Sequence, residues 1–253
     1  MKGLAGELYV DDGGQGGLPV VFVHASAGSS AQWAAQLTHL RKSRRALALD
    51  LRGHGRSEPA RDGAYEVEDF AADVGAVVDG LGLERFVLVG HSLGGAVCAA
   101  YAAAHPSRVA GLLLLDPASD GRQIPAEQAK GLMDVLASEA WLPVVEEYWA
   151  PMLAPSRPEV REQVLSGLRA TAQAAVRGGL GALLTFDPVA ALGRYPGPKL
   201  SFVTAYNQGP DAYQHLVPDL PSRRVDVPTG HWVQLDAPEW VDGALDAFLA
   251  TVR

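Results

Sequence analysis

Short apolar runs recur along the chain and predict the strands of a sheet. Each has three to five residues and is continuous rather than alternating, as in strands buried on both faces of a parallel sheet. The runs occupy residues 20–23, 46–49, 86–89, 112–115, 200–203 and 225–227. Their starts lie 26, 40, 26, 88 and 25 residues apart, and one strand–helix–strand unit takes about 30 residues. We therefore predict an α/β fold with a mostly parallel, doubly wound sheet.

The 88-residue interval is about 60 residues longer than one crossover requires. Within it, residues 126–149 and 158–184 are rich in helix-forming residues and carry apolar side chains at helical spacing. Interspersed prolines predict several separate helices rather than one long helix. We expect a core of residues 1–118 and 199–253, with residues 119–198 inserted as a helical cap.

The 253 residues carry a net charge of −8, which argues against nucleic acid or an anionic membrane surface as a partner. No apolar run approaches 18 residues and no signal peptide is evident, so we expect a cytoplasmic protein. Cys98 is the single cysteine, and no Cys/His cluster has the spacing of a metal site. We expect no metal and no cofactor. The sequence does not indicate an oligomeric state.

The most informative motif is Gly-His-Ser-Leu-Gly at residues 90–94, between an apolar run and an Ala-rich segment. A G-x-S-x-G motif between a strand and a helix is typical of a nucleophile elbow. Ser92 then lies on a sharp turn, and Gly90 and Gly94 leave room where a side chain would collide with neighbouring backbone. The helix N-terminus behind Ser92 favours negative charge that develops near it.

Four motifs in order resemble the α/β-hydrolase fold superfamily, and the resemblance covers nearly all of the chain. They are VVFVHASAGSSAQW, DLRGHGRS, GHSLGG and GHWVQLDAPE. The resemblance implies an oxyanion hole formed by the backbone N–H groups of Ser26 and Leu93. Ala25 stands where the family usually has Gly, a difference that could alter the dihedral angles of this loop.

A serine nucleophile needs a base, and His231 follows an apolar run and a turn at the predicted carboxyl edge of the sheet. The order serine, acid, histidine is the one this fold uses. The family usually places the acid after the strand here predicted at 200–203, where this chain has amides. In some members of the superfamily the acid instead follows the strand after the nucleophile helix. This chain resembles them in having Asp116 directly after the run at 112–115, which makes Asp116 the favoured acid, with Asp211 second and Asp120 third.

These residues predict a serine hydrolase that cleaves an ester or lactone of apolar character through an acyl-enzyme. A carbon–carbon bond hydrolase, a thioesterase or a cofactor-free perhydrolase would use the same triad, and a ligand-binding receptor on a hydrolase shell is the non-enzymatic alternative.

We also expect Asp236 to cap the last helix, in a capping box with Glu239. The side chains expected near the substrate are His24, Ala25, His91, Trp141, Trp149 and Trp232.

Overall fold

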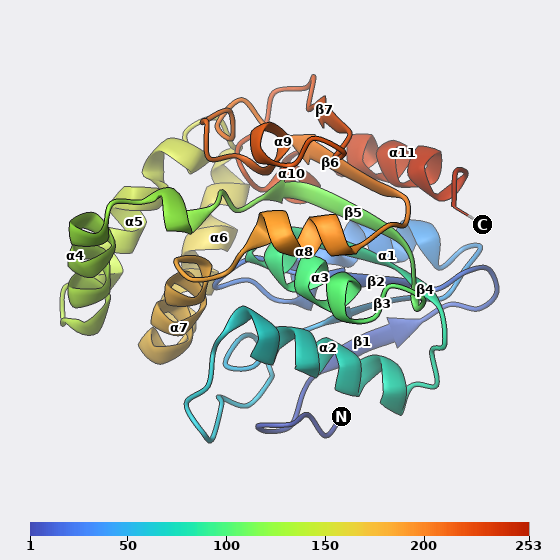
Figure 1. The fold of residues 1–253 in the computed structure, drawn as a ribbon, viewed down its shortest axis with the longest axis horizontal. Helices are drawn as coiled ribbons and strands as arrows, with labels where there is room; N and C mark the ends of the chain where they lie inside the picture. The colour runs from blue at the N-terminus through green and yellow to red at the C-terminus, as the bar shows by residue number, and fades with distance from the viewer. Residues whose placement is uncertain (253) are drawn as a thin grey trace.

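A twisted sheet runs through the middle of the chain (Figure 1). The computed structural model describes residues 1–252, and within them the sheet has seven strands in the order β1-β3-β2-β4-β5-β6-β7. Only β1 is antiparallel to its neighbour, so the predicted α/β fold with a mostly parallel sheet is confirmed. The strands are β1 (Val10–Gly13), β2 (Val20–Val23), β3 (Ala46–Leu49), β4 (Phe86–Ser92), β5 (Val109–Pro117), β6 (Lys199–Val203) and β7 (Ser222–Arg224).

Helices cover both faces of this sheet, and four more gather at one end of it (Figure 1). The helices on the two faces are α1 (Ala34–Leu40), α2 (Val67–Gly80), α3 (Leu93–Ala104), α8 (Pro188–Arg194) and α11 (Pro238–Leu249). Those at the end of the sheet are α4 (Ala126–Ala137), α5 (Trp141–Leu153), α6 (Pro158–Ala170) and α7 (Gln173–Leu183). The short elements are η1 (Ser30–Trp33), η2 (Gly121–Gln123), α9 (Tyr213–Leu216) and α10 (Val233–Asp236).

The continuous apolar strands form two hydrophobic cores, one on each face of the sheet. One core packs α2 and α3 against the sheet and includes Phe70 and Tyr101. The other packs α1 and α11 against the opposite face and includes Leu37 and Phe248. All four residues of β2 and all four of β3 are buried, as expected for strands covered on both sides. This packing fixes the carboxyl ends of the strands, from which the candidate site is built.

Helices α4 to α7 have an apolar cluster of their own, which includes Val145, Leu153 and Leu168. Ala27 and Trp232, which belong to the sheet-bearing part, join this cluster and connect it to the strand ends. Helix α8 instead packs against α3. The sheet-flanking layer thus resumes at Pro188, within the segment predicted as cap, and the division at 119 and 198 stays a prediction.

Three local features differ from the sequence prediction. The last strand ends at Arg224, before the apolar run at 225–227. It was not predicted at its true position because it is an exposed edge strand, whose residues have no continuous apolar run. The antiparallel edge strand β1 was missed for the same reason, since its residues are only partly buried. The predicted capping box of Asp236 with Glu239 is wrong: Ala237 precedes α11, and Asp236 ends α10.

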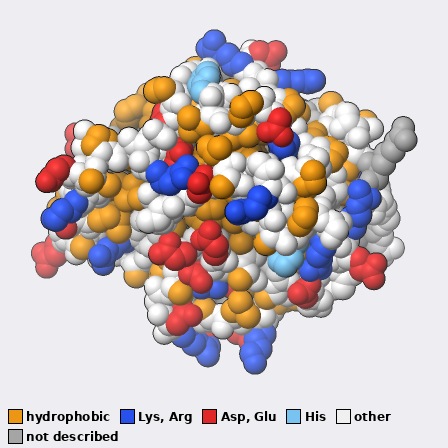
Figure 2. All heavy atoms as spheres, viewed as in Figure 1, with side chains coloured by type: hydrophobic (Ala, Val, Ile, Leu, Met, Phe, Trp, Pro, Cys, Tyr) orange, Lys and Arg blue, Asp and Glu red, His pale blue; other side chains and the backbone are white. Residues whose placement is uncertain are grey.

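Among the described residues, no single helix is both long and apolar enough to cross a membrane. Helices α7 and α8 meet the length and composition test only when taken together, and they are bent by 72° at the break between them. On the face shown in Figure 2, acidic and basic side chains are interspersed, so the net charge of −8 is not gathered there into one patch.

Candidate active site

Ser92 lies on the sharp turn between β4 and α3 and has a left-handed φ of 52°. A Cβ atom added to Gly90 would lie 2.3 Å from the carbonyl oxygen of Gly94, and one added to Gly94 would lie 2.3 Å from that of Val23. Neither position can hold a side chain without moving backbone. The steric reason predicted for both glycines is confirmed, and this tight packing holds Ser92 in its strained conformation.

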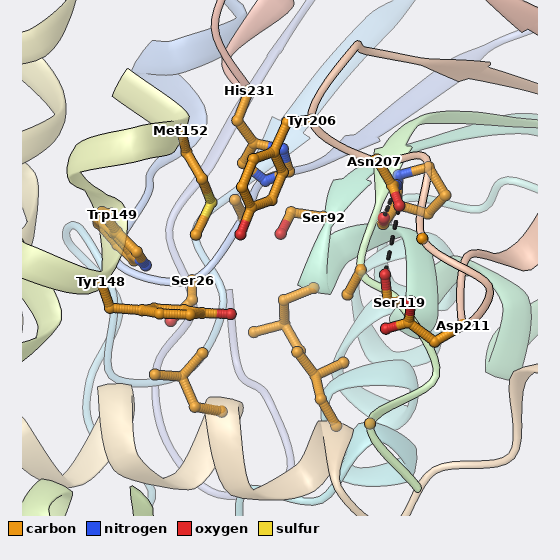
Figure 3. Close-up of a pocket in the computed structure, with 18 of the residues that line it drawn as sticks. Ser26, Ser92, Ser119, Tyr148, Trp149, Met152, Tyr206, Asn207, Asp211 and His231 are labelled. Atoms are coloured by element: carbon orange, nitrogen blue, oxygen red, sulfur yellow. Dashed lines mark hydrogen bonds between the residues drawn. The ribbon is translucent and has the colours of Figure 1, made fainter. Parts of the chain in front are cut away.

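His231 and Asp116 meet at the carboxyl edge of the sheet. His231 Nδ1 lies 2.5 Å from Asp116 Oδ2, and both side chains are buried. Because a carboxylate can only accept, Nδ1 carries the proton and donates it to Asp116. This assignment leaves Nε2 of His231 as the ring nitrogen that can accept a proton. His231 and Ser92 line the same cavity (Figure 3).

The loop after β6 holds Asp116 in place with donors instead of supplying the acid itself. Thr204 donates its backbone N–H to Asp116 Oδ1 and its hydroxyl to Oδ2, each at 2.8 Å. Asn207 Nδ2 donates to the carbonyl oxygen of Pro117 at 2.6 Å. From the sequence, this stretch is notable only for lacking a carboxylate. A threonine or amide there, after an aspartate on the neighbouring strand, is the signal that could have indicated this support.

Neither of the two alternative acids contacts His231 in the described part of the chain. Asp120 forms an ion pair with Arg122 at 2.9 Å and accepts from its backbone N–H. Asp211 lines the cavity, but within residues 1–252 its side chain makes no hydrogen bond to His231. Of the three predicted carboxylates, the structure brings only Asp116 to the histidine.

Three of the residues predicted near the substrate do not line the cavity. His24 Nδ1 donates to the carbonyl oxygen of Ala25, and its Nε2 accepts from the Leu51 backbone N–H at 2.9 Å. His91 lies behind His231, with Nε2 3.0 Å from the His231 carbonyl oxygen. Trp141 packs at the edge of the α4–α7 cluster. Both histidines are completely buried, and their ring nitrogens form hydrogen bonds to backbone groups instead of facing the cavity.

Burial also keeps these two histidines neutral. Desolvation lowers the pKa of His24 from its ordinary value. It lowers the pKa of His91 well below that value, and repulsion from a protonated His231 acts in the same direction. A neutral His91 then donates from Nε2 to the His231 carbonyl oxygen while its Nδ1 lies 3.1 Å from the Gln234 amide nitrogen. The backbone of His231 is thereby held by a residue that does not line the cavity.

The cavity has a volume of about 400 Å³ and one predominantly apolar side (Figure 3). Ala25, Trp149 and Trp232 line it as predicted, and the two tryptophan rings pack edge to face at 5.3 Å. Tyr148 and Met152, two of the aromatic and Met residues of the inserted segment considered for a pocket roof, line it as well. Several other lining residues were not predicted, because their contact depends on how the helices fold over the strand ends. These include Ser119, Ile124, Leu180, Leu183, Tyr206 and Asn207.

Aromatic side chains at the cavity also leave apolar surface open to solvent. Tyr148 is 55% exposed and Tyr206 48% exposed, although both line the cavity. Burial of the hydroxyl raises the pKa of Tyr206 to about 12, with further contributions from Tyr148, Asp116 and Asp211. Exposed apolar surface of this kind commonly marks a binding site.

The loop after β2 and the start of α3 supply backbone groups beside Ser92. Ser26 and Leu93, the predicted oxyanion-hole residues, both line the cavity. The Ser26 hydroxyl is buried and has no hydrogen-bond partner in the described part of the chain. Ala27 in the same loop has a left-handed φ of 52°. Among residues 1–252, no group of three His, Cys, Asp or Glu side chains could hold a metal ion.

This elbow, its histidine loop and the surrounding sheet define a hydrolase architecture, and comparison with known proteins agrees. The sequence model of the alpha/beta hydrolase fold matches residues 19–238, so the chain belongs to that family. The chain is 30% identical over 249 residues to the dihydrolipoyllysine-residue acetyltransferase component of the acetoin cleaving system of Pseudomonas putida. That alignment covers 94% of this chain and 65% of the relative, and the next two curated relatives are covered to 40% and 37% of their length.

Solved structures of the same fold include two named hydrolases. A thermophilic esterase from Thermogutta terrifontis superimposes with a TM-score of 0.82 at 26% identity, over 96% of this chain and 93% of that one. An enol-lactonase from Burkholderia xenovorans superimposes with a TM-score of 0.83 over 98% of both chains. At 20% identity, the likeness to the lactonase shows the fold alone.

Proposed function

We propose that the protein hydrolyses a carboxylic ester or a lactone through an acyl-enzyme formed on Ser92. The observation that carries the proposal is the hydrogen bond from His231 Nδ1 to the buried Asp116, beside a cavity that Ser92 also lines. The similarity to a thermophilic esterase of the same fold, at 26% identity, supports it. The apolar side of the cavity suits a substrate of apolar character.

In the first half-reaction, His231 Nε2 takes the proton of the Ser92 hydroxyl as the oxygen attacks the ester carbonyl carbon. The carbonyl oxygen becomes an oxyanion, stabilised by the backbone N–H groups of Ser26 and Leu93. Asp116 keeps the proton on Nδ1 and stabilises the imidazolium. The carbonyl then re-forms, the bond to the alcohol oxygen breaks, and the imidazolium protonates the leaving alcohol.

In the second half-reaction, a water molecule takes the place of the alcohol. His231 removes one proton from the water as its oxygen attacks the acyl carbon. The second tetrahedral intermediate uses the same oxyanion hole. Its collapse breaks the bond to Ser92, and the proton returns from the imidazolium to the serine oxygen, which releases the carboxylic acid and restores the enzyme.

Replacing the nucleophile tests the proposal directly. We expect Ser92→Ala to lower kcat on p-nitrophenyl acetate by about 10⁴-fold or more and to abolish labelling by a fluorophosphonate. Ser107→Ala is the matched control, because Ser107 is exposed and lies outside the cavity. Full activity of Ser92→Ala would refute the mechanism. A panel of p-nitrophenyl esters of graded chain length and of γ- and δ-lactones then separates esterase from lactonase activity.

The identity of the acid is tested by two amide variants. Asp116→Asn keeps the shape of the side chain but loses the charge that stabilises the imidazolium, so we expect kcat to fall by about 10³- to 10⁴-fold. Asp211→Asn should lower kcat far less, since Asp211 does not contact His231. The reverse order of the two effects on kcat for p-nitrophenyl acetate would make Asp211 the acid.

A further inference from the structure

The charged groups that face the cavity are unevenly distributed. Asp211 contributes a carboxylate, while within residues 1–252 no lysine or arginine lines the cavity. Figure 3 shows Asp211 beside Ser119 and Asn207, on the side of Ser92 away from Trp149 and Met152. The cavity around Ser92 therefore has one side lined by Trp149 and Met152 and an opposite side that carries the Asp211 carboxylate.

The carboxylate of Asp211 is available to a ligand because its neighbours are already paired. The Ser119 hydroxyl donates to Asn207 Oδ1 at 3.3 Å, and Asn207 Nδ2 donates to the Pro117 carbonyl oxygen. Asp211 forms no side-chain hydrogen bond and no ion pair in the described part of the chain. After burial of the Tyr206 hydroxyl and the larger effects of Tyr148 and Asp116, the charge of Asp211 adds to the rise in the pKa of Tyr206, which shows that the two side chains are near each other.

The Asp211 side chain folds back over the preceding turn. Its Oδ1 lies over Gly209, where an added Cβ would come within 2.3 Å of that oxygen, so a side chain at position 209 would require the carboxylate to move. The backbone N–H of Asp120 donates to the Asp211 carbonyl oxygen at 2.9 Å, which ties this loop to the segment after β5.

We propose that Asp211 determines specificity by selecting substrates with an ammonium group on the arm next to Ser119 and Asn207, and by disfavouring substrates with a carboxylate there. This inference rests on the proposed function of Ser92. A cation beside Asp211 gains an electrostatic attraction to the carboxylate that a neutral group of the same shape lacks. An anion there is repelled by a carboxylate that no basic side chain of the cavity neutralises. The net charge of −8 adds a weak attraction for cations in solution.

Equilibrium binding tests the selection independently of catalysis. Choline and 3,3-dimethyl-1-butanol have nearly the same shape and differ by the charge of the ammonium group. We expect choline to bind about tenfold more tightly at low salt, measured by the fluorescence of Trp149 and Trp232, which line the cavity. Asp211→Asn should remove this preference, while Glu127→Gln, which removes an exposed charge outside the cavity, should retain it. Equal binding of the two alcohols to the wild-type protein would overturn the inference.

Hydrolysis of matched esters supplies the second measurement. Butyrylcholine pairs with 3,3-dimethylbutyl butyrate, and p-nitrophenyl 4-(trimethylammonio)butanoate pairs with p-nitrophenyl 5,5-dimethylhexanoate. We expect kcat/KM to favour the cationic member of at least one pair, and Asp211→Asn to reduce that ratio by about tenfold. If both members of a pair are hydrolysed and Asp211→Asn leaves their kcat/KM ratio unchanged, the role of Asp211 is refuted while the proposed function of Ser92 stands. Full activity of Ser92→Ala on the neutral esters refutes the proposed function, and the binding experiment still decides the selection.

Discussion

Asp116 is a buried carboxylate whose position depends on a few donors. It is fully buried and has a left-handed φ of 42°. A buried charge is costly unless hydrogen bonds compensate it, and here Thr204 supplies two of them while His231 supplies the third. The orientation that the carboxylate presents to His231 is therefore controlled by the side chain of Thr204 as well as by the backbone of β5.

Removing the Thr204 hydroxyl should weaken this control. Thr204→Val keeps the volume but deletes the donor to Asp116 Oδ2, the oxygen that also accepts from His231. We expect kcat on p-nitrophenyl acetate to fall by about tenfold, in line with the loss of one charge-assisted hydrogen bond. Thr204→Ser retains the hydroxyl and should recover most of the activity. Equal activity of the valine and serine variants would show that the hydroxyl does not matter.

At the level of single residues, the sequence indicated Ser92 and His231 because each sits in a local motif. The steric demand on Gly90 and Gly94 is local too, and the structure shows the same close approaches. The pairing of Asp116 with His231 joins residues 115 positions apart, and only strand order and family resemblance pointed to it. The roles of Thr204 and Asn207 were not predicted, because donors after β6 become informative only once the aspartate on the neighbouring strand is taken as the acid.

At the level of elements, the histidine loop is tied to the helices that cover it. The backbone N–H of His231 donates to the Met152 carbonyl oxygen at 3.1 Å, at the end of α5. Asp236 Oδ2 accepts from the Ser156 hydroxyl at 2.7 Å and from the Gly230 N–H at 2.9 Å. The residue that the sequence suggested as a helix cap thus links the turn between α5 and α6 to the residue preceding His231.

Replacing Asp236 should therefore affect both stability and activity. Asp236→Ala leaves the Gly230 N–H and the Ser156 hydroxyl without their acceptor, and we expect the free energy of unfolding to fall by about 2 kcal/mol. The kcat should fall as well, because the loop that carries His231 loses a support. Urea unfolding and steady-state kinetics measure the two effects.

Glu239→Ala is the control for this link, since Glu239 is exposed in the first turn of α11. Its charge near the helix N-terminus contributes only about 0.3 to 1 kcal/mol, and we expect kcat to stay unchanged. Had the two residues formed a capping box, both variants would destabilise the protein similarly and neither would change kcat. That result would contradict a role for Asp236 in supporting the histidine loop.

The elements themselves were predictable to the extent that they are buried on both sides. The central strands carry continuous apolar runs because helices cover both faces of the sheet, and β2 and β3 begin and end where those runs do. The edge strands β1 and β7 lack that signature and were missed or misplaced. Within the inserted segment, Pro151 lies inside α5 instead of ending it, and the helix continues to Leu153. A proline near a helix end removes few backbone hydrogen bonds, so it marks a boundary only loosely.

At the scale of the whole molecule, three buried histidines make folding sensitive to acid. His24, His54 and His91 are completely or almost completely buried. His24 joins the loop after β2 to that after β3, His54 bonds within the loop after β3, and His91 at the end of β4 contacts the His231 carbonyl oxygen. Desolvation is the largest cause of the lowered pKa at each of them, and for His54 it brings the pKa to about 3. Each side chain is accommodated in the neutral form, and protonation would place an unpaired charge in the interior.

The sign of the resulting pH dependence follows from proton binding in the two states. Above pH 6.5 these histidines are neutral in both the folded and the unfolded chain, and they contribute no slope. Below that pH the unfolded chain binds protons that the native chain excludes, so acid favours unfolding until the pH passes the native pKa, about 3 for His54. Each histidine adds up to about 1.4 kcal/mol per pH unit in this window.

We expect the free energy of urea unfolding to decline steadily as the pH falls from 6.5 to 4. His54→Asn should reduce the slope of this decline by up to about 1.4 kcal/mol per pH unit, the contribution of one titrating group. The asparagine amide can still donate to the Arg52 carbonyl oxygen, which accepts from His54 Nδ1 at 2.9 Å, but it does not titrate. The variant is less stable at pH 7.5 because a smaller side chain leaves space in the interior, so the slope and not the absolute stability carries the result.

His105→Asn, at an exposed position, should leave the slope unchanged. An identical slope in wild type and His54→Asn would mean that His54 is already protonated in the folded protein, against its burial beside His24 and the desolvation that lowers its pKa.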